Sequence, residues 1–381
     1  MTIQTGKPTR RHDIDWLRVM AVLLLVPFHA ARIFDIWEPF YAKNDQVSVA
    51  LSCIFIGAIG SWHMPLFFLL AGASTWLALR FRSSGDYVKE RFKRLVVPLI
   101  FGVLVLTPPQ TYLGARTYGH FAGSLFQYYP QFFRVGPDGS LTGYMGGFTP
   151  GHLWFILFLF VLSLVALPFF LHLKRENGRH LIDRLAVFLA RPGALYLLAI
   201  PLILTQALPD IGGKNPFYYL TLFIYGYILM SDARFEAALD RHKTPALIMG
   251  LGTLAVIIVG MALDVDLSGW LSMIVWGVFY HGFTAWCCLI ALLGFGRKRL
   301  NFTNQTLQYA SPAAYPFYIL HQVAIVLVGF YVVQWDVGML TKFSTIVIAA
   351  IGITILAYDL LIKRSDVTRF LCGMKRKPPT A

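Results

Sequence analysis

Histidines interrupt the long apolar runs of this chain, where ionisable side chains are costly. Insertion of each such group into a membrane costs roughly 2.5–3.5 kcal/mol, so its presence indicates a structural or functional role. Five histidines lie in or at the rim of these runs, namely His29, His63, His152, His281 and His321. A single one is most simply explained as a neutral ring that donates a hydrogen bond to a neighbouring helix. Five together favour one central polar site.

Arg18 and His29 share the first apolar run, DIDWLRVMAVLLLVPFHAARIF over 13–34, and are eleven positions apart. At 3.6 residues per turn this spacing places them on nearly one helix face, about 16 Å apart along the axis. Arg18 alone could reach toward lipid headgroups or pair with Asp15, three residues earlier. Neither interaction of Arg18 accounts for the presence of His29 on the same helix face.

Arg91 and Arg94 lie three apart in KERFKRLVVP, at the start of the third apolar run. Guanidinium groups suit phosphate, which they can hold with two parallel hydrogen bonds. Together with Arg18 they predict an anion site at one mouth of a cavity. The alternative is ordinary anchoring by basic residues at the cytoplasmic surface.

The composition indicates a membrane protein that must position these groups. Of the 381 residues, 57% are hydrophobic and only 14% are charged, whereas a soluble domain carries about a quarter charged residues. The net charge of +14 is better explained by basic cytoplasmic loops than by nucleic-acid binding. The four cysteines fit neither a disulfide framework nor a zinc site, and we expect no metal.

Helices of about 20 apolar residues are needed to cross a bilayer, and ten candidate spans satisfy or approach this length. They are 16–34, 50–79, 95–113, 153–173, 193–208, 216–231, 245–263, 269–295, 311–333 and 340–362. Similar runs continue down the chain, so the first is a retained anchor rather than a signal peptide. The fifth and sixth spans are short.

The basic residues give the spans a direction. With the N-terminus inside and strict alternation, 26 of the 33 Lys and Arg residues fall on the cytoplasmic side and six on the outer side. This bias predicts that both termini are cytoplasmic. We therefore expect an all-α, multi-pass membrane protein with a single domain over 1–381, comprising a helical core of about 14–362 and a basic tail of 363–381.

The longest segment outside the predicted spans, 114–152, is rich in glycine, tyrosine and phenylalanine. A loop of nearly forty residues is usually functional or disordered. Its aromatic rings could receive a sugar-like acceptor from outside, or could lie on the lipid surface as an aromatic belt. These residues alone do not identify a reaction.

Four stretches, in this order, give the chain a resemblance to the acyltransferase-3 family of bacterial inner-membrane proteins. They are DIDWLRVMAVLLLVPFH, HMPLFFLLAGA at 63–73, KERFKRLVVPLIFG at 89–102, and the pair GHLWFILFLF at 151–160 with YPFYILH at 315–321. Several details resemble a glucan-succinylating subgroup. Trp16 and Ala71 depart from residues common elsewhere in the family, and no esterase-like domain follows the last span.

The resemblance implies an enzyme that moves an acyl group from cytoplasmic acyl-CoA to a hydroxyl group of an extracytoplasmic glycan. It implies His29 as catalytic base and Arg18, Arg91 and Arg94 as coenzyme A contacts. A neutral imidazole can remove the hydroxyl proton as the oxygen attacks the thioester. Direct transfer and an acyl-histidine intermediate both stay open.

The supporting or substrate-contacting residues implied by the resemblance are His63, His152, Trp154 and His321. Acyl-CoA is a donor substrate, so no permanently bound cofactor is expected. The partners are acyl-CoA, the glycan or other hydroxyl acceptor, and the lipid bilayer.

Other functions are compatible with part of the pattern. A transporter could also use intramembrane histidines and a basic mouth, although no internal repeat is visible. An inactive membrane sensor could keep the fold. The motif order does not match unrelated membrane O-acyltransferases. The acyl group, the acceptor and the oligomeric state are not specified by the sequence.

Overall fold

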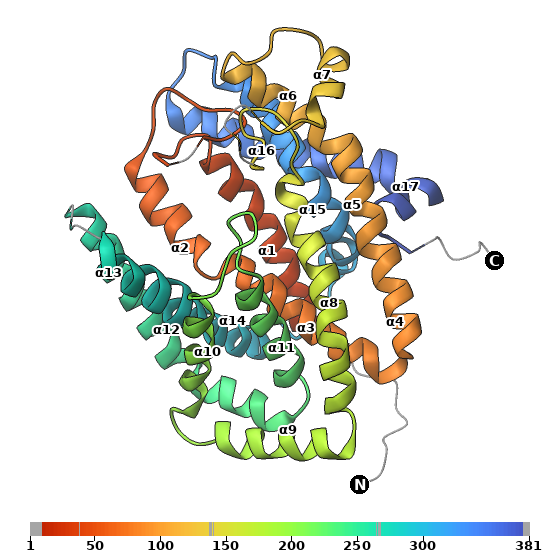
Figure 1. Ribbon diagram of the computed structural model, residues 1–381, viewed down its shortest axis with the longest axis vertical. Coiled ribbons are helices and arrows are strands. Elements are labelled where there is room, and N and C mark those ends of the chain that lie inside the picture. The colour runs from red at the N-terminus through yellow and green to blue at the C-terminus, as the bar shows by residue number, and fades with distance from the viewer. Residues whose placement is uncertain are drawn as a thin grey trace.

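The computed structural model describes residues 10–375, except 38, 137, 138, 140, 264, 266 and 267. Within those residues the chain is helical and forms no β-strand (Figure 1). This confirms the all-α fold. Three of the basic residues assigned to the cytoplasmic side, Lys7, Arg376 and Lys377, lie outside the described residues, as does the end of the predicted tail.

Eight helical segments among the described residues are long and apolar enough to cross a membrane. They are His12–Ala31, Leu51–Phe81, Ser84–Thr117, Gly151–Leu173, Ala233–Met261, Gly269–Arg299, Gln305–Val332 and Met339–Ile362. Each overlaps one predicted span. Two shorter apolar segments, Ala194–Thr205 and Pro216–Leu229, coincide with the predicted fifth and sixth spans. The count of ten spans stays a prediction.

The α-helices follow one another with few long connections. They are α1 (His12–Ala31), α2 (Gly57–Gly60), α3 (His63–Phe81), α4 (Ser84–Arg91), α5 (Val97–Phe101), α6 (Thr107–Thr117), α7 (Leu125–Phe132), α8 (Trp154–Leu173), α9 (Glu176–Leu189), α10 (Ala199–Thr205), α11 (Pro216–Leu229), α12 (Ala233–Ala262), α13 (Gly269–Ser272), α14 (Ala285–Arg299), α15 (Gln305–Val332), α16 (Met339–Ala357) and α17 (Asp366–Leu371).

Several spans contain π-helical stretches, which are rare in proteins. These are η1 (Leu51–Ile56), η2 (Phe92–Val96), η3 (Gly102–Leu106), η6 (Met273–Thr284) and η7 (Tyr358–Ile362). The 3₁₀ segments η4 (Gly151–Leu153) and η5 (Ala194–Leu198) precede α8 and α10. The π-helical stretches join short α-helices into continuous spans.

Side-chain caps fix where several helices begin. Asn304 accepts a hydrogen bond from the backbone of Leu307 at the start of α15. Asn215 caps α11 by accepting from the backbone of Tyr218, beside Pro216 in the first turn. Such caps satisfy backbone donors that have no partner within the helix.

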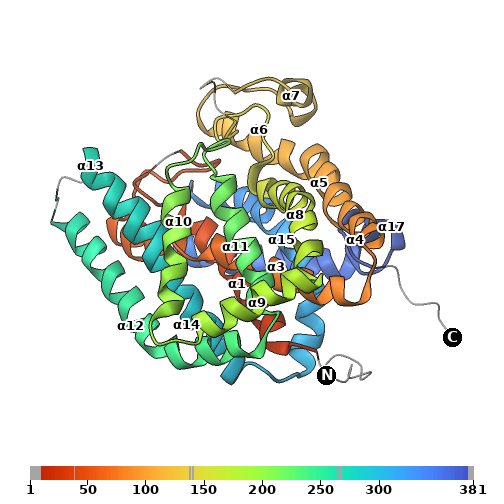
Figure 2. The same cartoon turned by 60° about the horizontal axis from the view of Figure 1, so that its bottom comes forward.

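Helix α1 lies in the centre of the bundle, packed against α15, α14, α16 and α3 (Figures 1 and 2). Its buried side chains include Leu17, Val22, Leu25 and Val26. A helix that contacts neighbours on several sides is apolar around most of its circumference. This central position surrounds the polar groups of α1 with protein.

Helices α3 and α11 approach closely because each presents a glycine to the other. A Cβ atom on Gly72 would lie 1.9 Å from the carbonyl oxygen of Phe223. A Cβ atom on Gly226 would lie 1.9 Å from the carbonyl oxygen of Leu69. Small residues allow two helix backbones to pack this closely in membranes.

The ends of spans that the charge pattern assigns to the cytoplasm lie together in the structure. Arg10, before α1, donates to the Ser311 hydroxyl near the start of α15. Tyr315 of α15 donates to the backbone oxygen of Arg94 on η2. These contacts agree with the predicted alternation of spans.

Candidate functional site

The ring of His29 lies near the C-terminal end of α1, between aromatic and histidine side chains. It faces His321 of α15, with ring centroids 5.3 Å apart, and stacks on Phe40 with centroids 6.2 Å apart. The Nδ1 atom of His29 is buried and has no hydrogen-bond partner. A ring nitrogen without a protein partner can interact with a bound substrate.

Backbone carbonyls orient the rings of His321 and His152. Nδ1 of His321 lies 2.6 Å from the carbonyl oxygen of Tyr318, and Nε2 of His152 lies 3.0 Å from that of Ile319. A carbonyl oxygen only accepts, so these nitrogens carry hydrogen. In each neutral ring the other nitrogen is then an acceptor.

Both remaining nitrogens, Nε2 of His321 and Nδ1 of His152, are buried without a partner. The two rings contact each other, with centroids 5.1 Å apart. Together with His29 they form what we call the histidine cluster, made of His29, His152 and His321. The cluster offers buried lone pairs to hydrogen-bond donors such as hydroxyl groups.

His63 lies beside this cluster and holds two helices together. Its Nε2 atom donates to the backbone oxygen of Ala21 on α1, 2.7 Å away. Its ring contacts Phe28, which in turn contacts His29. His63 therefore packs α3 against α1 near the site.

Trp154 packs against aromatic residues outside the histidine cluster. Its ring packs against Tyr219, with centroids 5.3 Å apart, and against Phe68. Lys214 lies over the same ring, with its Nζ 5.5 Å from the centroid. These contacts place Trp154 in the packing between α8, α3 and α11.

His281 lies elsewhere, on η6. It contacts Tyr280 and Tyr218 and lines a separate cavity. The expectation of one central site for all five histidines is therefore wrong for His281. The occurrence of five histidines in apolar runs does not show which of these runs become neighbours.

Arg18 and Arg91 meet consecutive residues of α3. Arg18 donates to the Ser74 hydroxyl at 2.9 Å and pairs with Asp15 at 3.1 Å, so the predicted Asp15 pair is confirmed. Arg91 donates to the Thr75 hydroxyl at 2.6 Å. Two guanidinium groups thus meet adjacent residues in the C-terminal half of α3.

Arg94 differs from these two arginines. Its side chain is 46% exposed, and its Nε lies 3.5 Å from a carboxylate oxygen of Glu90. Glu90 also pairs with Arg82. Of the three predicted coenzyme A contacts, Arg94 is therefore the one that neighbouring side chains hold least firmly.

Two segments cover the histidine cluster at the end of α1 opposite Arg18. The segment after α1 contributes Phe40, which packs against Tyr144 of the 118–150 segment, with centroids 5.6 Å apart. Tyr41 contacts the same Tyr144 ring at 5.1 Å. Within the long segment, the backbone nitrogen of Gly147, at φ +87°, donates to the Tyr128 hydroxyl and so ties this part of the chain to α7.

Comparison with known proteins assigns this arrangement to a family. The acyltransferase-3 family, described as an acyltransferase domain, matches residues 11–361. The chain belongs to this family. It is a membrane acyltransferase, as the resemblance implied.

Curated relatives agree with this assignment. Proteins named glucans biosynthesis protein C from Salmonella typhi, Salmonella typhimurium (strain LT2) and Salmonella agona (strain SL483) are each 22% identical over 391 aligned residues. Each alignment covers 97% of this chain and 96% of the relative. No solved structure matches the acyltransferase.

Sequence reasoning missed the buried carboxylate of Asp35. This side chain is fully buried and pairs with Arg32 at 3.1 Å and with Lys43. The pairing holds the segment that places Phe40 on His29. Its sequence signal is the charge cluster of Arg32, Asp35 and Lys43 at the end of the first predicted span and directly after it.

Ser74 and Thr75 were also missed. They are two adjacent hydroxyl residues within an apolar span, and such polar residues within membrane helices commonly hydrogen bond to other helices. That rule could have marked them as partners for basic groups.

Within the residues that the structure describes, no group of three His, Cys, Asp or Glu side chains is arranged to hold a metal ion.

Proposed function

We propose that this acyltransferase moves an acyl group from cytoplasmic acyl-CoA to a hydroxyl group of an extracytoplasmic glycan, with His29 as general base. The observation that carries the proposal is the ring of His29, which faces His321 with a buried, unpartnered nitrogen. Arg18, on the same helix, lies at the opposite end beside Ser74.

The two ends of α1 suit the two ends of the donor. Coenzyme A carries its phosphates on the nucleotide part, and guanidinium groups bind phosphate well. Arg18 and Arg91, held against Ser74 and Thr75, would bind that part. The pantetheine arm would then extend along α1 and bring the thioester near His29.

The reaction needs a proton acceptor for the attacking hydroxyl group. A ring nitrogen of His29 takes this proton as the oxygen bonds to the thioester carbonyl carbon. The carbon–sulfur bond then breaks, and the departing sulfur takes the proton from the imidazolium. The products are an ester and free coenzyme A, and such general base catalysis contributes about 10²–10⁴-fold.

The other two rings of the cluster suit a glycan acceptor. A sugar presents several hydroxyl donors, and His321 and His152 each hold an unpartnered acceptor nitrogen in place. Hydrogen bonds to these nitrogens would orient the sugar so that one hydroxyl group meets His29. This would be a positioning role.

The test is acyl transfer by the full chain in lipid nanodiscs, with isotopically labelled acetyl-CoA and succinyl-CoA and an envelope glycan as acceptor. We expect labelled ester on the glycan with the wild type and none with His29→Ala. His180→Ala, at an exposed position of α9, is the matched control. Full activity of His29→Ala at equal abundance would overturn the assignment of the base.

Mass spectrometry of envelope glycans from cells with and without the protein tests the acceptor class. We expect an acyl ester that is present only with the wild-type protein. Acyl-CoA-independent movement of a solute into proteoliposomes, with no ester formed on any glycan, would contradict the proposal and favour a transporter.

A further inference from the structure

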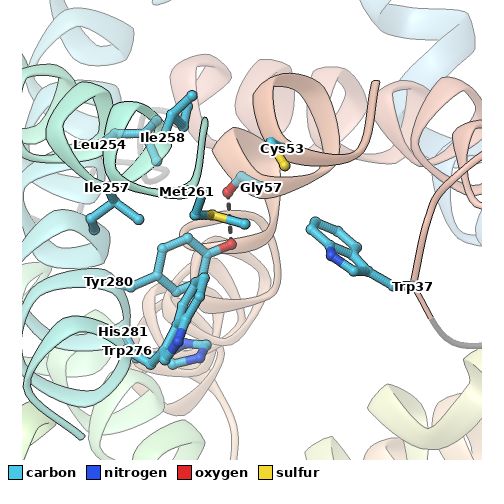
Figure 3. Close-up of a pocket in the computed structure, with 10 residues that line it drawn as sticks. All are labelled: Trp37, Cys53, Gly57, Leu254, Ile257, Ile258, Met261, Trp276, Tyr280 and His281. Atoms are coloured by element: carbon cyan, nitrogen blue, oxygen red, sulfur yellow. Dashed lines mark hydrogen bonds between the residues drawn. The ribbon is translucent and has the colours of Figure 1, made fainter. Parts of the chain in front are cut away.

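A cavity lies away from the histidine cluster, between η1, α12 and η6 (Figure 3). Its volume is about 510 Å³, and pockets for small molecules typically measure about 300–1,000 Å³. Figure 3 shows Ile257 and Met261 on one side, Trp276 and His281 below them, and Trp37 across the opening. Neither the family assignment nor the proposed chemistry uses this cavity.

The cavity wall is mainly hydrocarbon. Leu254, Ile257 and Tyr280 are buried and form a hydrophobic cluster separate from the main core. The same helix α12 presents Val256, which is 73% exposed, to its outer side. In a membrane that outer side faces lipid chains, so the cavity wall is formed in part by a helix that borders the bilayer.

Polar groups in the cavity are few and differ in their availability. The Tyr280 hydroxyl donates to the backbone oxygen of Gly57 at 2.7 Å and is therefore engaged. The ring of His281 makes no hydrogen bond to any described residue, although its backbone oxygen accepts from Tyr218. Its ring nitrogens can thus serve a ligand. Both residues lie on η6, and π-helical segments frequently occur at functional sites.

One chain segment borders both the cavity and the histidine cluster. Trp37 lines the cavity, and Phe40, three residues later, stacks on His29. The backbone of Ile36 donates to the Ser52 hydroxyl of η1, which ties this segment to the cavity wall. A molecule in the cavity therefore lies next to the segment that covers the reacting histidine.

We propose that this cavity binds the hydrocarbon chain of a membrane-dissolved acyl acceptor, whose hydroxyl-bearing head then reaches the histidine cluster. The inference rests on the proposed function and narrows its acceptor to an amphiphile. The donor is placed at the opposite end of α1, beside Arg18. The lining matches a hydrocarbon chain, and His281 can hydrogen bond to the polar group that joins the chain to its head.

The first test measures binding without catalysis. The full chain in nanodiscs is irradiated with a dodecyl glucoside that carries a diazirine in its alkyl chain, and labelled peptides are identified by mass spectrometry. We expect labels within 254–261 and 276–281, removed by excess dodecyl glucoside but not by methyl glucoside. Labels that are absent there, or that excess dodecyl glucoside does not remove, would overturn the proposal.

A second probe separates acceptor from donor. Acyl-CoA with a diazirine in a long acyl chain should leave those two peptides unlabelled. If it labels them and the glucoside does not, the cavity holds the donor chain and our assignment is wrong. Since neither labelling experiment requires turnover, both stand even if the proposed acyl transfer fails.

The third test fills the cavity. Ile257→Trp should lower kcat/KM for dodecyl glucoside by about tenfold, the size of effect that a changed apolar pocket produces, and leave methyl glucoside unchanged. Val256→Trp, on the exposed side of α12, is the matched control and should change neither value. Ile258→Phe, at a half-buried lining position, is the milder filling variant if Ile257→Trp folds poorly.

The outcomes separate the two proposals. If Ile257→Trp and Ile258→Phe lower kcat/KM equally for dodecyl glucoside and methyl glucoside, the cavity has only a structural role and the inference is overturned. The inference is also overturned if kcat/KM changes for neither glucoside in properly folded variants. If the wild type acylates neither glucoside, the glycoside acceptors fail, and the labelling pattern alone decides whether the cavity binds an alkyl chain.

Discussion

The rings of His29 and His321 face each other between α1 and α15, with centroids 5.3 Å apart and planes inclined by 36°. The contact joins a partly exposed histidine to a fully buried one. Because Tyr318 fixes the hydrogen on Nδ1 of His321, its Nε2 presents a lone pair. In the proposed mechanism the two histidines have different roles: His29 reacts, and His321 orients the acceptor.

His321→Ala tests the orienting role. Loss of one hydrogen bond to the acceptor should raise the KM for the glycan by about tenfold, which corresponds to roughly 1.4 kcal/mol. The KM for acyl-CoA should stay unchanged, because the proposed donor site lies at the other end of α1. Initial rates with each substrate varied in turn give both values. A rise in the KM for acyl-CoA alone would contradict the assignment.

Substitution of the three arginines Arg18, Arg91 and Arg94 should weaken the binding of acyl-CoA to different extents. Arg18→Gln and Arg91→Gln remove guanidinium groups that α3 holds in place, so each should raise the KM for acyl-CoA by about tenfold at similar kcat. Arg94→Gln should have a smaller effect, since its side chain is half-exposed and lies near Glu90. Titration with labelled acyl-CoA measures the affinities directly. An effect of Arg94→Gln as large as that of Arg18→Gln would show that all three bind the donor.

The sequence predicted the positions of the eight long apolar helical segments well, because the hydropathy of a segment is a local sum over its residues. It also predicted the Arg18–Asp15 pair, which lies within one helix turn. It did not predict that Arg18 meets Ser74 or that Arg91 meets Thr75, because these contacts depend on which helices become neighbours. Local spacing carries no information about that choice.

His281 lies within η6, a π-helical stretch of 12 residues, in which hydrogen bonds run from i to i+5. The sequence grouped His281 with the other four histidines because all five lie in or at the rim of apolar runs. That shared property carries no information about which helices become neighbours, so it could not separate His281 from the central cluster.

The glycine contact between α3 and α11 predicts a stability effect. Gly72→Ala would place a methyl group against the backbone oxygen of Phe223 and should destabilise the fold by about 1–3 kcal/mol through overpacking. Gly252→Ala is the control, because a Cβ atom there meets no heavy atom within 4 Å. Thermal unfolding in detergent should show a lower midpoint for Gly72→Ala only. Equal midpoints would show that the two helices can separate without cost.

The predicted direction of the spans can be tested with added cysteines because the native ones are all buried. Burial raises the pKa of the Cys372 thiol to about 12, and only the thiolate reacts readily with maleimide. A rise from pH 7 to pH 9 stays below that pKa, so Cys372 should stay unlabelled at both values, and burial should protect the other native cysteines from the reagent. An exposed cysteine with an ordinary pKa of about 8.5 should react faster at pH 9.

Phe126→Cys and Arg184→Cys complete this test. Phe126 is 89% exposed on α7, which the charge pattern places outside, whereas Arg184 is exposed on α9, which it places inside. A membrane-impermeant maleimide applied to intact bacterial spheroplasts should label Phe126→Cys only, and both variants after lysis. Labelling of Arg184→Cys before lysis would reverse the orientation. Arg18 would then lie on the outer side, away from cytoplasmic acyl-CoA, and the donor path along α1 would have to be abandoned.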